Sequence, residues 1–393
     1  MQNDSSILKI ISTTFLVLLF PLFANASTLY LLPQSQDVYS DGTFVADVWV
    51  DTEGKSINAI DAALEYPKNL IDVIDISDGN SIISFWIEKP RNEDSKERII
   101  FIGGTPKGFS GQGIIFRIIF KSKPDSHGSG ELGFSDETKV LLNDGSGTED
   151  TMKLISGDFN IVKKPADLPF IISKTHPDQN MWYRNRILDL HWDLQNGAEY
   201  SYLLSKDPIA EVDEIKDAPE GNMAWMGDMS YNGLSDGIYY FHLKQKLSGK
   251  SWSEKITFRA MIDATGPEKF IPEITEIEGK KYLIFNAPDS ASGISRYEVK
   301  EERTRNLIEK LFRKADNRDF EEGQSPYLLR DQSLASEIII KATDKAGNEQ
   351  VAKLSSLEKP DNDKNLMAVF LVFMMIVILV ATFLFGKKLY CSR

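Results

Sequence analysis

Apolar and polar residues alternate with a period of two through most of this 393-residue chain. The stretch FVADVWVD (44–51) is one example, and INAIDAALEY (57–66) and RIIFIGG (98–104) continue the pattern, with Gly, Pro, Asn and Asp between such segments. Successive side chains of a β-strand point to opposite faces, so this alternation predicts short strands that bury one face. Many such strands separated by turn residues are typical of β-sandwiches. The expected fold class is all-β.

Two proline-containing segments divide the strand-rich region, KKPADLPF (163–170) and IDATGPEKFIP (262–272). Proline and glycine at these points favour linkers over continued strands. The divisions predict three consecutive β-domains, at residues 28–163, 168–263 and 267–357. We interpret the charged stretch 301–322 as a solvated surface insertion and the polar segment 358–364 as a stalk.

The chain begins with an apolar segment that has the features of an export signal. Lys9 precedes the apolar run 10–23, and the tripeptide Ala-Asn-Ala at 24–26 supplies the small-x-small pattern of a signal-peptidase site. Strand-like alternation begins directly afterwards. Residues 1–26 are therefore predicted to be a signal peptide.

A second apolar segment lies near the C-terminus. Residues 366–385 are twenty residues without a charge. As a helix they would span about 30 Å, the thickness of a bilayer's hydrocarbon core. Lys387 and Lys388 follow directly, and basic residues favour the cytoplasmic side. We expect a single-pass protein of the cell membrane, with its N-terminus outside and a cytoplasmic tail at 386–393.

The charge and cysteine content narrow the classes of partner. The formal net charge is −13 at pH 7, a field that repels nucleic acids. Cys391 is the single cysteine and lies in the predicted tail. The predicted outer domains therefore have no disulfides, and each must depend on its own apolar core. The HExxH, CxxC and GxSxG patterns of hydrolytic sites do not occur, so we expect a protein that is not an enzyme and has no cofactor.

The first predicted domain resembles the cohesin family. The segment INAIDAALEYPKNLIDVIDI (57–76) carries most of the resemblance, with GIIFRIIFKSK (113–123) and GDFNIV (157–162) following in the same order. The resemblance implies a jelly-roll β-sandwich that binds dockerin modules. The second domain resembles fibronectin type III-like domains at DGIYYFHLK (236–244), and the third resembles bacterial immunoglobulin-like repeats at IIIKATDKAGN (338–348).

The period-two pattern also predicts which side chains of the first domain face outward. With Ile60, Ala62 and Leu64 in the core, Asp61 and Glu65 point outward. With Ile83, Phe85 and Ile87 inward, the outward side chains of the next segment are Ser84, Trp86 and Glu88. An outward Trp86 would suit a protein hot spot or a sugar-stacking platform, although it could instead pack under a loop or a neighbouring domain.

The cohesin resemblance implies a role for these residues. It places both segments in one sheet whose outer face binds the dockerin, and it puts Asp61 where cohesins present an acidic hydrogen-bonding residue. The sequence departs from the family at Ala59, where dockerin-binding cohesins often carry a polar side chain. The partner-binding candidates are Asp61, Glu65, Ser84, Trp86 and Glu88. A dockerin-like protein module is the expected partner, with a polysaccharide or a purely structural surface role as alternatives.

The segment LLNDGSGTED (141–150) admits two interpretations. Asp144, Glu149 and Asp150 could be calcium ligands, or the segment could be a tight turn between strands. A helix-loop-helix calcium site is excluded, because position twelve counted from Asn143 is a leucine and not a glutamate. Glycine supplies the backbone conformations that tight turns need, so the turn is favoured and calcium remains the alternative.

Overall fold

A computed structural model describes residues 26–217, 227–303, 319–355 and 371–375. The predicted signal peptide except its last residue, Ala26, and all of the predicted membrane helix except the helical residues 371–375, lie outside this range. Most of the charged insertion 301–322, the stalk and the tail lie outside it as well. Among the residues that are described, no helix is long and apolar enough to cross a membrane.

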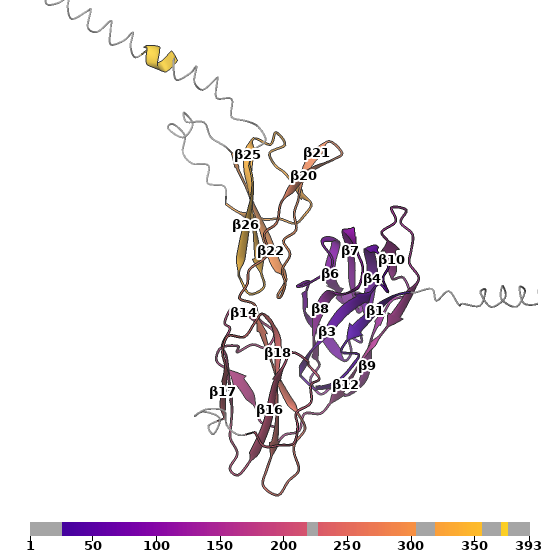
Figure 1. Cartoon of the computed structure of the whole chain (residues 1–393), viewed down its shortest axis with the longest axis vertical. Coiled ribbons are helices and arrows are strands. Elements are labelled where there is room, and N and C mark those ends of the chain that lie inside the picture. The colour runs from indigo at the N-terminus through magenta and orange to yellow at the C-terminus, as the bar shows by residue number, and fades with distance from the viewer. Residues whose placement is uncertain (1–25, 218–226, 304–318, 356–370, 376–393) are drawn as a thin grey trace, which may run out of the picture.

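Strands β1–β12 form the first unit, which consists of two sheets around one core (Figure 1). The five-stranded sheet has the order β11-β1-β3-β8-β5. Its strands are β1 (Ser27–Leu32), β3 (Thr43–Asp51), β5 (Ile71–Ser77), β8 (Gln112–Ser122) and β11 (Met152–Ile155). The seven-stranded sheet has the order β2-β12-β9-β4-β7-β6, with β10 also paired to β4. Its strands are β2 (Ser35–Tyr39), β4 (Ile57–Glu65), β6 (Phe85–Glu93), β7 (Arg98–Phe109), β9 (Gly128–Phe134), β10 (Lys139–Leu142) and β12 (Gly157–Val162).

The core of the first unit follows from the alternation in the sequence. Inward residues of facing strands meet, as Phe101 of β7 and Phe116 of β8 do with ring centroids 4.7 Å apart. Leu29, Ile60 and Leu64 are buried beside them. Each fully buried side chain of this size stabilises the fold by about 1.5–3 kcal/mol relative to an exposed one. The first unit is thus a β-sandwich that is held by apolar burial.

Strands β13–β19 form the second unit, which also has two sheets. The three-stranded sheet has the order β13-β15-β17 and the four-stranded sheet β14-β19-β18-β16. The strands are β13 (Ile171–Ser173), β14 (Trp182–Tyr183), β15 (Leu188–Trp192), β16 (Glu199–Ser205), β17 (Asp228–Tyr231), β18 (Gly237–Lys246) and β19 (Ile256–Ile262). Trp192 and Phe241 pack at the centre of this unit, with ring centroids 5.7 Å apart.

Strands β20–β26 form the third unit. Its sheets have the orders β20-β21-β24 and β23-β22-β25-β26. The strands are β20 (Glu273–Ile277), β21 (Lys280–Ile284), β22 (Ile294–Arg303), β23 (Glu321–Glu322), β24 (Tyr327–Leu328), β25 (Ser336–Asp344) and β26 (Glu349–Leu354). Phe285 and Tyr297 meet edge to face in its core, with centroids 4.9 Å apart.

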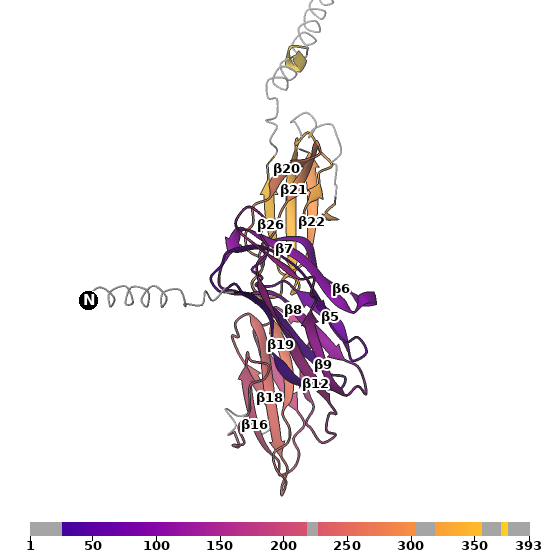
Figure 2. The ribbon, with the colours of Figure 1, turned by 90° about the vertical axis from the view of Figure 1, so that its right-hand side faces the viewer.

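The first unit does not stand apart from the other two but packs against both (Figures 1 and 2). Val45 of β3 and Ile119 of β8 belong to one apolar cluster with residues of the second and third units. The other members of this cluster are Trp182, Ile238, Tyr240, Met261 and Ala291. Both Val45 and Ile119 belong to the five-stranded sheet, so this sheet provides the docking side of the first unit.

Polar contacts reinforce the docking. Arg259 of the second unit donates a hydrogen bond of 3.2 Å to the Thr43 hydroxyl of the first. Lys345 of the third unit binds the Asp75 carboxylate at 2.5 and 2.6 Å. The Ser77 hydroxyl donates to the carbonyl of Ser292 at 2.6 Å. These pairs lie more than 200 residues apart in sequence, so only the folded chain brings them together.

Candidate recognition surface

The outer face of β10, β4, β7 and β6 carries rows of side chains that run across the strands. Residues that pair across antiparallel strands lie on the same face of the sheet. In one row Asp61 of β4 lies between Lys139 of β10 and Ile102 of β7, and Ile102 pairs in turn with Glu88 of β6. We call these four strands and their outward side chains the outer face.

A second row supplies apolar surface. Ala63 of β4 pairs with Ile100 of β7, and Ile100 pairs with Arg91 of β6. Ile100 and Ile102 are half-buried, so they remain partly accessible at the centre of the face. Charged residues lie on both sides of them. An apolar centre with a polar rim is the usual anatomy of a surface that binds protein.

Several charges of the outer face are already paired within it. Arg91 binds Glu88 at 2.5 Å, and Lys139 binds Glu149 at 2.7 Å. The hydrogen bond with Glu149 is the main cause of a raised pKa for Lys139. Among the residues described by the structure, Asp61 and Glu65 are exposed and take part in no ion pair. These two carboxylates therefore remain available for a partner.

Four of the five predicted binding residues lie at the surface of the seven-stranded sheet or beside it. Asp61, Glu65 and Ser84 are exposed and Glu88 is half-buried. As the resemblance implied, β4 and β6 belong to the same sheet. Ser84 is also part of the contact between units, since its carbonyl accepts a hydrogen bond of 2.8 Å from the Asn286 side chain of the third unit.

The predicted orientation of Trp86 was wrong. Its side chain is only 9% exposed and belongs to the core of the first unit, whereas Ile87, expected in the core, is 69% exposed. The pairing of β6 with β7 shifts between Trp86 and Glu88, so Ile87 is an extra residue in a β-bulge. A bulge reverses the alternation of side chains along the strand that carries it. Gly103 opposite makes room for the indole, because a Cβ there would lie 2.8 Å from two ring carbons of Trp86.

The three calcium candidates of segment 141–150 have separate contacts. Asp144 accepts a hydrogen bond of 2.8 Å from the Ser146 amide, and Glu149 binds Lys139. Asp150 binds Lys55 and accepts a hydrogen bond of 2.5 Å from the hydroxyl of Ser27. Burial by itself raises the pKa of Asp150, but these hydrogen bonds outweigh it and the net shift is downward.

The backbone of this segment forms a turn. Gly145 and Gly147 have φ angles of 72° and 69°, which glycine adopts without strain. The amide of Leu142 donates to the carbonyl of Thr148 at 2.8 Å, closing the turn. Asp150 then ties its end to the first strand of the unit through Ser27. Each carboxylate thus has a structural contact of its own.

The sequence-based reasoning missed Ile100, Ile102 and Lys139 as parts of the outer face. A usable signal existed for the two isoleucines. Ile99 and Phe101 are fully buried, so the same alternation applied to RIIFIGG places Ile100 and Ile102 outward. Lys139 carries no such signal, because its position opposite Asp61 depends on how β10 pairs with β4.

No protein-family model matches the sequence, and no curated protein matches it. Solved structures of cohesin modules resemble about a third of the chain. A non-cellulosomal cohesin of Archaeoglobus fulgidus is 21% identical with a TM-score of 0.30, covering 35% of this chain and 93% of that one. A type I cohesin–dockerin complex from Clostridium thermocellum gives 20% identity and a TM-score of 0.30, covering 35% of this chain and all of that one. The cohesin module of a Clostridium perfringens family 33 glycoside hydrolase is 15% identical with a TM-score of 0.28, and the match covers 35% and 97% of the two chains.

Proposed function

We propose that this chain is a non-catalytic recognition protein of the cell surface, and that the outer face of its first unit binds a dockerin-like protein module. The observation that supports this proposal most directly is the way the first unit packs against the other two. Its five-stranded sheet is covered by the second and third units through the Val45 and Ile119 cluster. The centre of the outer face, around Asp61 and Ile102, belongs to the other sheet, and β10 lies on the far side of the unit from β18 (Figure 1).

The composition of the outer face supports a protein as partner. Ile100 and Ile102 offer apolar area for burial, and Asp61 and Glu65 offer acceptors for basic or hydroxyl groups. The alternative of polysaccharide binding depended on an outward tryptophan on which a sugar ring would stack. Trp86 is in the core instead, so this argument for sugar binding is lost. The resemblance of the first domain's sequence to cohesins adds the expectation of a dockerin-like module.

Replacing Ile102 by Arg tests the proposed face. The substitution places a charge at the apolar centre, so we expect the affinity for dockerin-like modules of the same organism to fall. Losing a central anchor costs about 2 kcal/mol or more, or at least about 30-fold in the dissociation constant. Asp61→Asn, which removes a charged acceptor, should cost about 1–3 kcal/mol if its partner group is buried.

The matched control is Ile172→Arg, the same change at an exposed isoleucine on β13 of the second unit. It should leave binding unchanged. Affinity would be measured by biolayer interferometry with immobilised wild-type and variant chains. If no dockerin-like module binds the wild type, the proposed function is wrong. If Ile102→Arg binds as the wild type does, another surface is the recognition face.

The membrane anchor is part of the same proposal. The uncharged segment 366–385 followed by Lys387 and Lys388 supports an outward-facing single-pass protein. We expect protease added to intact cells to remove the β units and to leave a small membrane fragment. An epitope tag placed after Arg393 should be protected from antibody until the cells are permeabilised. Staining of that tag on intact cells would contradict the orientation.

A further inference from the structure

Three carboxylates that no sequence motif pointed to meet where the three units join. Asp263 follows β19, Asp289 lies between β21 and β22, and Asp344 ends β25. Each offers an oxygen within 4.8 Å of the others. They are almost fully buried, with exposed fractions of 1%, 8% and 1%. Three like charges at this separation in a buried site repel one another strongly.

The same carboxylates hold the backbone of the junction. Asp263 accepts a hydrogen bond of 3.1 Å from the Ser292 amide, which joins the second unit to the third. Asp289 accepts one of 2.7 Å from the amide of Gly293. The carbonyl of Asp289 also accepts a hydrogen bond of 2.7 Å from the Asn80 amide of the first unit. A change of charge in this cluster therefore acts on contacts of all three units.

Three of the four basic side chains that lie near the cluster bind other carboxylates. From the first unit, Lys89 binds Asp78 at 3.0 Å, and Asp78 lies against Gly293. From the third unit, Lys345 binds Asp75 at 2.5 Å. From the second unit, Arg186 binds Asp236 at 2.9 Å, while Arg184 lies against Gly347. Within the described part of the chain, none of these four cations forms an ion pair with the cluster.

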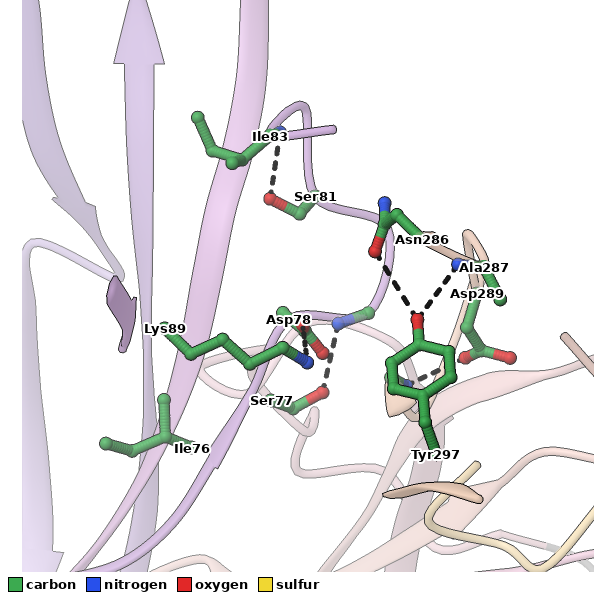
Figure 3. Close-up of polar contacts among 12 residues, drawn as sticks. Ile76, Ser77, Asp78, Ser81, Ile83, Lys89, Asn286, Ala287, Asp289 and Tyr297 are labelled. Carbon is green, nitrogen blue, oxygen red and sulfur yellow. Dashed lines mark hydrogen bonds and ion pairs between the residues drawn. The ribbon is translucent and has the colours of Figure 1, made fainter. Parts of the chain in front are cut away.

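Water can reach one member of the cluster. Asp289 forms part of the wall of a cavity of about 220 Å³ between the first and third units, together with Asp78, Glu268 and Asn286. Figure 3 shows Asp289 and Asn286 on one side of this space and Asp78, with Lys89 bound to it, on the other. The cavity gives protons a path to the junction. Its other carboxylates, Asp78 and Glu268, add negative charge near Asp289.

We propose that the junction is a proton-controlled clamp. When Asp289 and Asp263 hold protons, the repulsion within the cluster is small and the three units keep one arrangement. When the protons leave, mutual repulsion loosens the seam between the second and third units and weakens the hold on the first. The orientation of the recognition surface relative to the third unit then depends on external pH.

The direction and the range of pH follow from the environment of Asp289. Burial is the main cause that raises its pKa to about 6, and the charges of Asp263 and Asp344 add to this effect. Burial likewise raises the pKa of Asp263, with a further contribution from Asp344. A carboxyl whose pKa is raised on folding stabilises the fold at low pH, and this contribution is lost as pH rises through the folded pKa. The clamp is therefore closed at about pH 5 and loosened at about pH 8.

Electron spin resonance distance measurements on the full chain in detergent test the clamp. Cys391→Ser removes the native thiol, and Leu203→Cys on β16 with Leu328→Cys on β24 place one label on the second unit and one on the third. Both leucines are exposed. With chelator present, we expect a single narrow distance at about pH 5 and loss of that narrow distance at about pH 8.

Asparagine has the same shape as a protonated aspartate and cannot ionise. Asp289→Asn and Asp263→Asn should each keep the narrow distance at both pH values, and either variant serves if the other fails to fold. Asp193→Asn, at a carboxylate that is 96% exposed, should respond as the wild type does. A wild-type distance that is the same at both pH values would overturn the proposal. The proposal would also be overturned if millimolar calcium restored the narrow distance at about pH 8 while, in chelator, the distance did not change between the two pH values.

Discussion

Replacing Trp86 by Ala should destabilise the first unit by about 3–5 kcal/mol, the usual cost of deleting a large aromatic side chain from a core. The side chain is 9% exposed and fills the space that Gly103 leaves open on β7. No partner molecule is needed for this effect, since the loss is one of internal packing. Chemical denaturation of the chain, followed by circular dichroism and by hydrogen exchange at β6 and β7, would measure the change in the free energy of unfolding.

The neighbouring residue provides the matched control. Ile87 is 69% exposed, and Ile87→Ala should change the free energy of unfolding by no more than about 0.5 kcal/mol. The pair tests the β-bulge directly, because an unbroken alternation would exchange the two effects. If Trp86→Ala lowered the free energy of unfolding only slightly and Ile87→Ala lowered it strongly, the strand would have an unbroken alternation and no bulge.

Gly79→Ala should separate the first unit from the third while leaving each unit folded. A Cβ at Gly79 would lie 2.1 Å from the carbonyl oxygen of Ala291 and 2.9 Å from the amide nitrogen of Gly293. Both are backbone atoms, so no side-chain rotation can relieve the clash. The segments must move apart, which breaks the neighbouring hydrogen bond from Asn80 to Asp289. Each hydrogen bond lost in this way costs about 0.5–1.5 kcal/mol, in addition to the apolar contact.

The ion pair between Lys345 and Asp75 reports on this separation. Its 2.5 Å length allows a carbodiimide to join the two side chains without a spacer, and mass spectrometry detects the product. The yield should be high in the wild type and lost in Gly79→Ala. Gly133→Ala is the control, since a Cβ there has its nearest contact at 3.7 Å. If the cross-link yield in Gly79→Ala were as high as in the wild type, the backbone near residue 79 would have absorbed the clash by a local shift. This glycine would then not control the packing of the first unit against the third.

These two substitutions act on different properties of the recognition surface. Trp86 and Gly103 support β6 and β7 from beneath, so they determine whether the outer face exists. Gly79 lies where the first unit contacts the third, so it determines how that face is oriented relative to the third unit. Asp263, Asp289 and Asp344 lie at the same junction, and the proposed clamp would make this orientation respond to pH. A variant that changes binding can therefore be assigned to one property or the other.

The alternation of side chains was enough to predict much of the first unit. FVADVWVD and INAIDAALEY form β3 and β4, and the outward positions of Asp61 and Glu65 agree with their burial. Segment 141–150 contains a turn at the glycines that suggested one. These features depend on steric preferences and on side-chain periodicity within a few residues, so they can be read locally.

The arrangement of distant segments could not be obtained in this way. Trp86 faces the core because β6 forms a bulge against β7, and a bulge depends on how two strands pair. The five-stranded sheet is the covered one because Val45 and Ile119 match a surface built from residues 182 to 291. Asp263 and Asp344 stand at the ends of two strands and Asp289 in the loop between two others, and all three meet only when the second and third units pack. The sequence by itself determined the strands, most of their inner and outer sides and the all-β class, because these follow from local periodicity. The tertiary structure alone decided which sheet is covered, which face is open and where buried charges converge, because these depend on contacts between residues far apart in the chain.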